Sequence, residues 1–441
     1  MTRRGTANAL AFALLFLFTE VATAQVERIS VTDDEQQAVG GSYAPAVSDD
    51  GTVIAFRSSA ANLVAGDINE LPDVFVRDLA AGSTSLASLR PDGQPAGDFS
   101  KRPSISGDGR FVAFEAKHPN SSILVTALRD RALGTTEYLV PNTSSGNPAA
   151  PNLARLQGTI SADGSLIAFV TRDTLQNAFP TSIRPVNDDL NLTFDVFVYG
   201  RAMQPTPAIE RVSRLTSGQE LDADSRSPSI SGDGGVVAFE SFSELIPDDD
   251  NNAPDVVVRD RLTSTLELVS IALDAASGNG PSFAPSVSGD GRFIAFRSAA
   301  SDLVAGDSNG RHDVFVRDRT AGTTVRVSVS TGGDQANGHS MDPSISSDGR
   351  FVAFRSTATN LVSGDTNGRS DIFVHDRTTS ETVRIGQPPG GQSNGTSAAP
   401  AVSGSGAWIV FESDATNLVA ADTNASRDVF RAPNPLHGAN R

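Results

Sequence analysis

The sequence predicts an all-β protein, a seven-bladed β-propeller built from four-stranded antiparallel blades. Three observations lead to this fold class. A phrase of twelve residues recurs seven times along the 441 residues, each copy carries a glycine turn between two short apolar runs, and the N-terminal segment resembles a strand that the last repeat lacks. Repeated four-stranded units arranged around an axis form a propeller, in which few sheet edges stay open.

The repeated phrase opens near a proline and closes on a phenylalanine, as in Pro45–Phe56, and its weakest copy is Gly158–Phe169. Consecutive closing phenylalanines are 55 to 70 residues apart, which suits one structural unit copied seven times better than seven domains. The closing residues are Phe56, Phe114, Phe169, Phe239, Phe296, Phe354 and Phe411.

Each unit is expected to contain four short strands. In the sixth unit these are Ser344–Ser346, Arg350–Ser356, Asp371–His375 and Thr382–Ile385. The first two strands are separated by an Asp-Gly pair, which favours a tight hairpin because glycine readily adopts positive φ. Short strands, frequent turns and no sustained helical period favour an all-β unit.

The two ends of the repeat array predict how the ring closes. The seventh unit stops after its third strand, Asp428–Phe430. Residues 26–32 closely match the fourth strands of other units, such as Ile209–Ser213 and Thr324–Val329. We therefore expect the strand 26–32 to pair with blade 7 and to close a single propeller domain spanning residues 25–441. The units near residues 103–140 and 158–213 depart from the pattern beyond their first two strands.

The phrase Pro-Ser-Ile-Ser-x-Asp-Gly-Arg-Phe-Val-Ala-Phe, found at Pro343–Phe354, resembles the WD40-like (PD40) repeats of the TolB-type β-propeller family. The resemblance covers essentially all of residues 25–441, without the separate N-terminal domain that TolB carries before its propeller. It implies an exported propeller that is used for binding.

The first 24 residues have the features of a signal peptide. Arg3 and Arg4 precede an apolar run at Leu10–Phe18, and small residues follow at Ala22–Ala24. The run is too short to span a bilayer. We expect residues 1–24 to be removed and the chain to be exported, to the periplasm or to the extracellular medium, with no membrane span.

The composition of the chain excludes several classes of binding partner. The chain carries 52 acidic and 35 basic residues, a net charge of −17, and such a balance argues against nucleic acid and anionic membrane surfaces. It has no cysteine, which excludes disulfides, thiolate metal sites and cysteine nucleophiles. We expect a monomer that binds a protein or peptide outside the cytoplasm.

A second repeated pattern, Asp-x-Asn-x-x-x-Asp, lies in the expected loop between strands two and three. It occurs in six of the seven units and is absent from the second. The residues are Asp67, Asn69, Asp73, Asp189, Asn191, Asp195, Asp249, Asn251, Asp255, Asp307, Asn309, Asp313, Asp365, Asn367, Asp371, Asp422, Asn424 and Asp428.

These loops allow two interpretations. Oxygen side chains at positions one, three and seven could supply part of a calcium shell, completed by backbone carbonyls and water. Alternatively, Asp and Asn stabilise turns through hydrogen bonds to nearby backbone, and the last Asp could anchor the loop by accepting amide N–H groups. The calcium hypothesis treats all eighteen residues as metal ligands; the alternative assigns them to the fold.

No catalytic residue is predicted. The five histidines have no zinc-protease spacing. The principal hypothesis is a non-enzymatic binding scaffold. The alternative is an enzyme acting on a carbohydrate or a small ester in the central channel, marked by residues that break the repeat. Those residues are Lys117, His118, Arg155, Arg172 and Asp173.

Trp408 and the strand phenylalanines are expected to form inter-sheet core.

Overall fold

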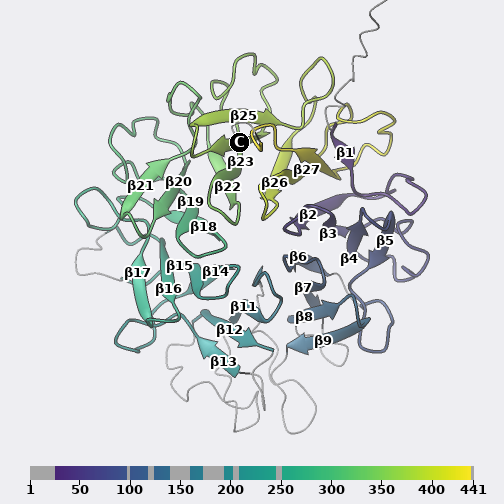
Figure 1. The fold of residues 1–441 in the computed structure, drawn as a ribbon, viewed down its shortest axis with the longest axis horizontal. Coiled ribbons are helices and arrows are strands. Elements are labelled where there is room, and N and C mark those ends of the chain that lie inside the picture. The colour runs from purple at the N-terminus through teal and green to yellow at the C-terminus, as the bar shows by residue number, and fades with distance from the viewer. Residues whose placement is uncertain are drawn as a thin grey trace, which may run out of the picture.

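The computed structural model describes residues 25–96, 100–117, 124–139, 159–171, 193–201, 208–244 and 251–438. They form seven four-stranded antiparallel sheets arranged in a ring (Figure 1), which confirms the predicted fold class. The signal peptide lies outside the described residues and stays a prediction. Among the residues that are described, no helix is long and apolar enough to cross a membrane.

The strands follow the repeat, blade by blade. Blades 1 to 3 contain β2 (Ser42–Val47), β3 (Val53–Ser58), β4 (Asp73–Asp78) and β5 (Ser83–Leu86); β6 (Lys101–Ile105), β7 (Phe111–Lys117), β8 (Leu124–Asp130) and β9 (Thr135–Leu139); and β10 (Thr159–Ile160), β11 (Leu166–Thr171), β12 (Asp195–Gly200) and β13 (Ala208–Arg211). Blades 4 and 5 contain β14 (Ser225–Ile230), β15 (Val236–Ser241), β16 (Asp255–Asp260) and β17 (Thr265–Leu268); and β18 (Ser282–Val287), β19 (Phe293–Ser298), β20 (Asp313–Asp318) and β21 (Thr323–Arg326). Blades 6 and 7 contain β22 (Ser340–Ile345), β23 (Phe351–Ser356), β24 (Asp371–Asp376) and β25 (Glu381–Ile385); and β26 (Ser397–Val402), β27 (Trp408–Ser413), β28 (Asp428–Pro433) and β1 (Glu27–Arg28). The second and third units, whose sequences depart from the repeat, still form complete blades.

The innermost strands are longer than the sequence predicts. In blade 6, β22 begins at Ser340, four residues before the expected start. The strand contains Pro343, and the register shifts between Met341 and Ser344, where Asp342 has a φ of 53°. Such a bulge leaves residues out of the hydrogen-bonded ladder, so a proline is tolerated inside the strand.

The N-terminal strand closes the ring as expected. Residue Glu27 pairs with Arg431 and Arg28 pairs with Phe430, so β1 is the fourth strand of blade 7. The amide of Ile29 continues the pairing by donating to the Val429 carbonyl at 2.8 Å. The regular strand is much shorter than the predicted 26–32, because the chain then turns into the link to blade 1.

The core lies between neighbouring sheets. In several blades two phenylalanines from the second and third strands stack, for example Phe56 on Phe75 with ring centroids 6.0 Å apart. Trp408 is only half-buried and packs differently from the core expected for it: its indole lies against Gly51 of blade 1 and beneath the Arg431 guanidinium, 3.9 Å from the ring centroid. It therefore packs at the interface between the last and first blades.

Backbone hydrogen bonds connect all seven blades around the axis. The carbonyl of the residue before each Asp-Gly or Ser-Gly pair accepts a hydrogen bond from a backbone amide of the preceding blade at 2.8–3.2 Å. Most of these residues are small, since a larger side chain would meet the neighbouring turn. They are Asp49, Gly107, Ala162, Gly232, Gly289, Ser347 and Gly404.

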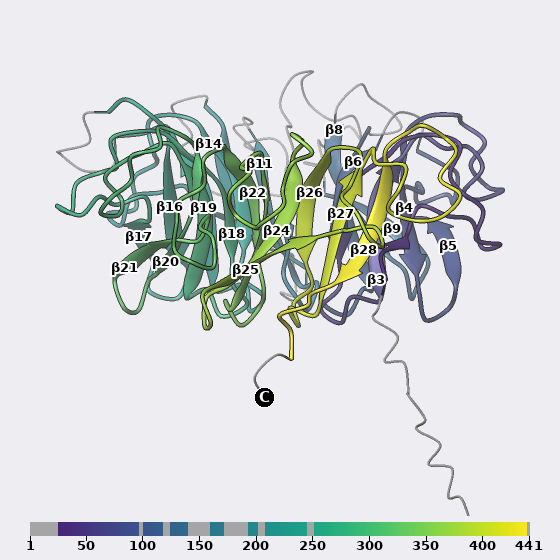
Figure 2. The same ribbon diagram turned by 90° about the horizontal axis from the view of Figure 1, so that it is seen from above.

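The turns and the loops lie on opposite faces of the ring. The glycine turns and the start of β1 occupy one face, and the chain also leaves β28 there (Figure 2). The described loops between second and third strands, together with the described links between blades, occupy the other face. We call this second face the loop face.

Candidate functional site

The repeated asparagine fixes the conformation of the acidic loops in which it is described. In blade 1, Asn69 accepts the amide of Leu71 on Oδ1 at 2.8 Å, while Nδ2 donates to Asp73 Oδ2 and to the Ala96 carbonyl, both at 2.8 Å. Asn309, Asn367 and Asn424 make the equivalent bonds. The asparagine thereby joins the loop to the link that follows the same blade.

In blades 1, 3, 4, 5 and 7 the last aspartate of the pattern accepts a hydrogen bond from a serine that lies two residues after the end of the fourth strand. Asp73 Oδ1 accepts the Ser88 hydroxyl at 2.5 Å, and the same hydroxyl oxygen accepts the Val74 amide at 2.9 Å. The sequence suggested that this aspartate accepts amide N–H groups directly. Instead, a hydroxyl stands between the carboxylate and the amide.

In three blades an arginine lies between the two aspartates. Arg326, Arg384 and Arg28 occupy the same fourth-strand position and approach the first aspartate to 3.1–3.2 Å and the last to 3.5–3.9 Å. In blade 3, Arg211 reaches Asp195 at 3.6 Å. The acidic pattern alone did not predict this partner, although the recurring Arg-x-Ser of the fourth strands indicated it.

Blades 1 and 4 lack that arginine. By strand register, Leu86 in blade 1 and Leu268 in blade 4 stand where Arg326 stands in blade 5. Leu86 belongs to the apolar cluster that contains Phe75. Asp67 and Asp73 of blade 1 therefore have no fourth-strand guanidinium beside them.

Some expected ligands are not described. Asp189, Asn191 and Asp249 lie outside the described residues, as do His118, Arg155, Arg172 and Asp173. In the described part of the chain, no three His, Cys, Asp or Glu side chains converge to hold a metal ion. The calcium hypothesis for the loops therefore stays a hypothesis, and it needs oxygen ligands beyond the carboxylates.

Burial changes the titration of the last aspartates. It raises the pKa of Asp73 to about 6, and the Asp67 carboxylate adds to that rise against the opposing bonds from Ser88 and Asn69. Burial likewise raises the pKa values of Asp313, Asp371 and Asp428, in the blades that have the arginine.

A second polar region lies at the loop face, where the first strand of each blade begins and the second strand ends. We call it the inner rim. Unlike the loops, it differs from blade to blade, so no repeated pattern in the sequence predicted it. Its residues are Tyr43, Arg57, Lys101, Arg102, Glu115, Arg226, Glu240, Phe283, Arg297, Met341, Arg355 and Glu412.

The glutamates of the inner rim are engaged within the protein. Glu412 accepts the Ala44 amide of blade 1 at 2.7 Å and pairs with Arg427 at 2.8 Å. Glu240 accepts the Ala284 amide of blade 5 at 2.9 Å. Glu115 pairs with Lys101 at 3.2 Å. These carboxylates cross blade boundaries or neutralise cations, so they hold the rim together.

Two arginines of the inner rim have no such partner. Arg57 lies 5.9 Å from the Tyr43 ring and Arg297 lies 5.0 Å from the Phe283 ring. Over the described ranges, neither guanidinium has a carboxylate within ion-pair distance, and the Nε atom of each is buried without a hydrogen-bond partner. Both side chains are partly exposed, so a ligand on the loop face could reach them.

Two hollows in the described part of the chain lie away from the inner rim. One of about 650 Å³ lies between blades 6 and 7 and is lined by Val26, Leu418 and several prolines. Another of about 490 Å³ lies between blades 5 and 6, beside Arg326 and His375. Neither hollow includes the inner-rim arginines.

The chain matches no protein-family model, and no curated protein matches its sequence. Solved structures do resemble it. An oligogalacturonate lyase from Vibrio parahaemolyticus aligns over 94% of this chain and 97% of its own with 13% identity and a TM-score of 0.54. The β-propeller domain of the Trilobed protease from Pyrococcus furiosus aligns over 89% and 92% with 12% identity and a TM-score of 0.53. TolB from Acinetobacter baumannii aligns over 80% and 67% with 14% identity and a TM-score of 0.43.

At these identities the first two similarities establish the fold alone. Together with the ring of seven closed blades, they define the protein as a seven-bladed β-propeller.

Proposed function

We propose that the protein is an exported binding propeller that holds an acidic protein or peptide segment against its inner rim. The observation that carries this proposal is the pair of arginines, Arg57 and Arg297, that have no carboxylate partner in the described chain. Each stands beside an aromatic ring. A guanidinium next to an aromatic ring suits a carboxylate-bearing ligand, because the ring packs against the ligand while the guanidinium donates hydrogen bonds.

Binding accounts for the distribution of polar groups better than catalysis does. The repeated Asp, Asn and Ser side chains of the described loops bond to one another, and the rim glutamates bond to neighbouring blades. What varies between blades is the inner rim, and variable residues on a rigid frame are the usual means by which a scaffold selects a partner. The chain carries a net charge of −17, so an acidic partner is attracted only where cationic side chains gather, as they do on this rim.

Panning of a random peptide library on the mature chain tests this function. We expect selected peptides rich in Asp and Glu, with affinities that fall as salt rises. The double variant Arg57→Ala/Arg297→Ala should weaken the selected peptides by at least about tenfold. Arg369→Ala is the control, because Arg369 is an exposed arginine on the same face outside the rim.

Two results would contradict the proposal. One is a selection without acidic enrichment, or with affinities that the double variant leaves unchanged. The other is turnover of a glycoside, uronate or ester substrate by the mature chain, which would favour the enzyme alternative.

A further inference from the structure

The acidic loop of blade 1 differs from those of blades 5, 6 and 7 in two neighbouring positions. The fourth-strand arginine is replaced by Leu86. The glutamine that approaches the loop in blade 5, Gln335, is replaced by Pro95, and both residues form the same isolated bridge. Gln335 accepts a hydrogen bond from Arg326 at 3.0 Å, so the two polar residues form one group in blade 5 and are both absent from blade 1.

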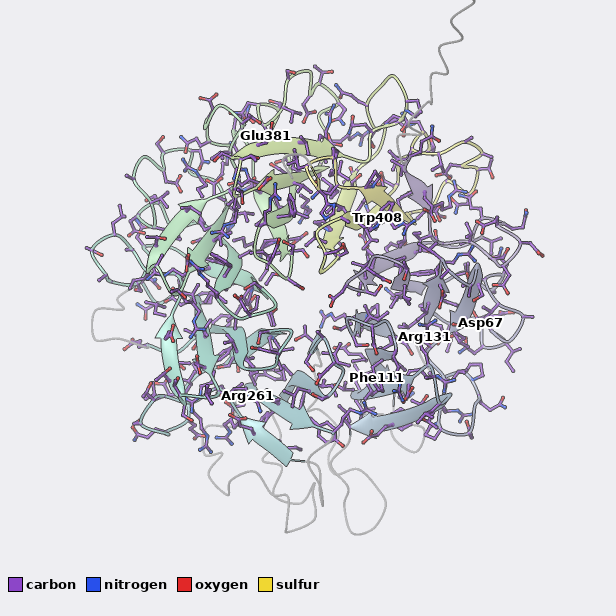
Figure 3. The ribbon with its side chains drawn as sticks, in the orientation of Figure 1. Asp67, Phe111, Arg131, Arg261, Glu381 and Trp408 are labelled. Atoms are coloured by element: carbon purple, nitrogen blue, oxygen red, sulfur yellow. The ribbon has the colours of Figure 1, made fainter. Side chains whose placement is uncertain are left out.

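The first aspartate of this loop is buried without a partner for one oxygen. Asp67 lies at the periphery of blade 1 (Figure 3) and is 8% exposed. Its Oδ1 atom is buried and has no hydrogen-bond partner. No cationic side chain of the described chain lies within ion-pair distance of it, whereas its counterpart Asp307 has Arg326 at 3.1 Å.

A second buried carboxylate stands close by. Asp73 is fully buried, and its two oxygens accept one bond each, from Ser88 and from Asn69. The two positions are close together in the repeated loop, because in blade 5 a single guanidinium reaches both equivalents, Asp307 at 3.1 Å and Asp313 at 3.9 Å. Burying two carboxylates without a positive partner costs folding free energy, so a proton or a cation must accompany them.

We propose that a divalent cation of the calcium class binds between Asp67 and Asp73 and there takes the place of the arginine of the other blades. The site offers hard carboxylate oxygens, which such a cation prefers. A charge of +2 neutralises both groups, while a guanidinium supplies only +1. Backbone carbonyls and water complete the coordination of a cation whose geometry is irregular and adaptable. Asn69 is not a ligand in this arrangement, because its side chain is already used in the loop.

This proposal separates the blades that the sequence pattern treats alike. Where an arginine lies between the aspartates, the positive charge is part of the chain and no metal is needed. Where leucine replaces it, the positive charge comes from solution. The protein therefore carries both forms of the same loop, which supplies matched variants for the test.

Calcium binding to the whole mature chain, measured by titration calorimetry in metal-free buffer, tests the proposal. We expect Asp67→Asn and Leu86→Arg each to lose one calcium equivalent relative to the unaltered chain. Arg326→Leu should gain one, because it gives blade 5 the leucine of blade 1. The thermal midpoint of the unaltered chain should rise with calcium concentration, and Leu86→Arg should reduce that rise while raising the midpoint in EDTA.

Different results would overturn it. If Asp67→Asn and Leu86→Arg keep the calcium stoichiometry and melting response of the unaltered chain, no cation binds here. A proton shared by Asp67 and Asp73 would give a midpoint that depends on pH and is insensitive to calcium. If Asp67→Asn fails to fold, the other two variants still decide, since each puts into one blade a residue that another blade contains.

Discussion

The Ser30 hydroxyl donates a hydrogen bond of 2.7 Å to Oδ1 of Asp428 and so joins two residues that are 398 positions apart. The same bond occurs within blade 5, where Ser328 donates to Asp313 at 2.6 Å. In both places the hydroxyl oxygen also accepts the amide of the residue after the aspartate, Val429 in blade 7. The N-terminal segment is thus joined to blade 7 by the same hydrogen bonds that join the fourth strand to the third in an ordinary blade.

Replacing Ser30 by alanine should destabilise the protein as much as the same change inside a blade. Ser30→Ala removes a donor from a buried carboxylate, a loss of about 1–3 kcal/mol in the free energy of unfolding. Ser328→Ala is the matched control, and urea denaturation of both variants provides the comparison. A neutral Ser30→Ala beside a costly Ser328→Ala would mean that the N-terminal segment does not close the ring in solution.

The repeat was enough to predict the ring, and the reason is visible in β1. Residues 26–32 share the Arg-x-Ser of other fourth strands, and those residue types make the seam contacts: Arg28 pairs with Asp422 at 3.2 Å, and Ser30 bonds to Asp428. The pattern could not predict the length of β22, because a proline usually ends a strand and only the bulge at Asp342 permits it there.

The candidate sites were less accessible to sequence reasoning. The acidic loops were found, but their partner Arg326 is thirteen residues beyond Asp313, and only the pairing of β20 with β21 brings the two together. The inner rim was not found. Arg57 and Arg297 look like ordinary strand residues, and their lack of a carboxylate is a property of the neighbouring blades.

A methyl group at Gly51 should weaken the contact between the first and last blades. Gly51 has a φ of 77°, and a Cβ atom there would lie 2.3 Å from the Trp408 ring. Gly51→Ala should cost about 1–3 kcal/mol more than the backbone strain alone, because the indole must shift. Gly82→Ala is the control, since Gly82 has a φ of 64° and open space around it. If urea denaturation shows the same loss in the free energy of unfolding for Gly51→Ala and Gly82→Ala, the indole does not pack against Gly51.

His375 should make the protein less stable as the pH falls. Burial lowers its pKa from 6.5 to about 4, although Asp376 opposes the change. The unfolded chain therefore binds more protons than the folded chain between these values, so the contribution of His375 is complete above pH 6.5 and is lost toward pH 4. At pH 5 the loss is about 2 kcal/mol.

The difference between the native chain and His375→Arg isolates this effect from the many carboxylates. Arginine occupies the equivalent position in blade 5, where Arg317 donates to Thr324 at 3.2 Å, and His375 is bonded to the matching Thr382. The variant does not titrate in this range. Urea denaturation at several pH values should show the native chain losing stability relative to the variant below pH 6.5. Parallel pH profiles would contradict the assignment.

Removing an arginine from an acidic loop should leave two carboxylates buried without a positive charge. Arg384 lies 3.1 Å from Asp365 and 3.5 Å from Asp371, and all three side chains are at most 10% exposed. Arg384→Leu should cost about 3–5 kcal/mol at pH 7 when EDTA removes divalent cations, the usual penalty for half of a buried ion pair. Arg369→Leu alters an exposed arginine of the same loop and should change stability by about 0.5 kcal/mol or less. Similar losses for the two variants would mean that the arginine does not neutralise the loop, and the leucine of blade 1 would then need no cation in its place.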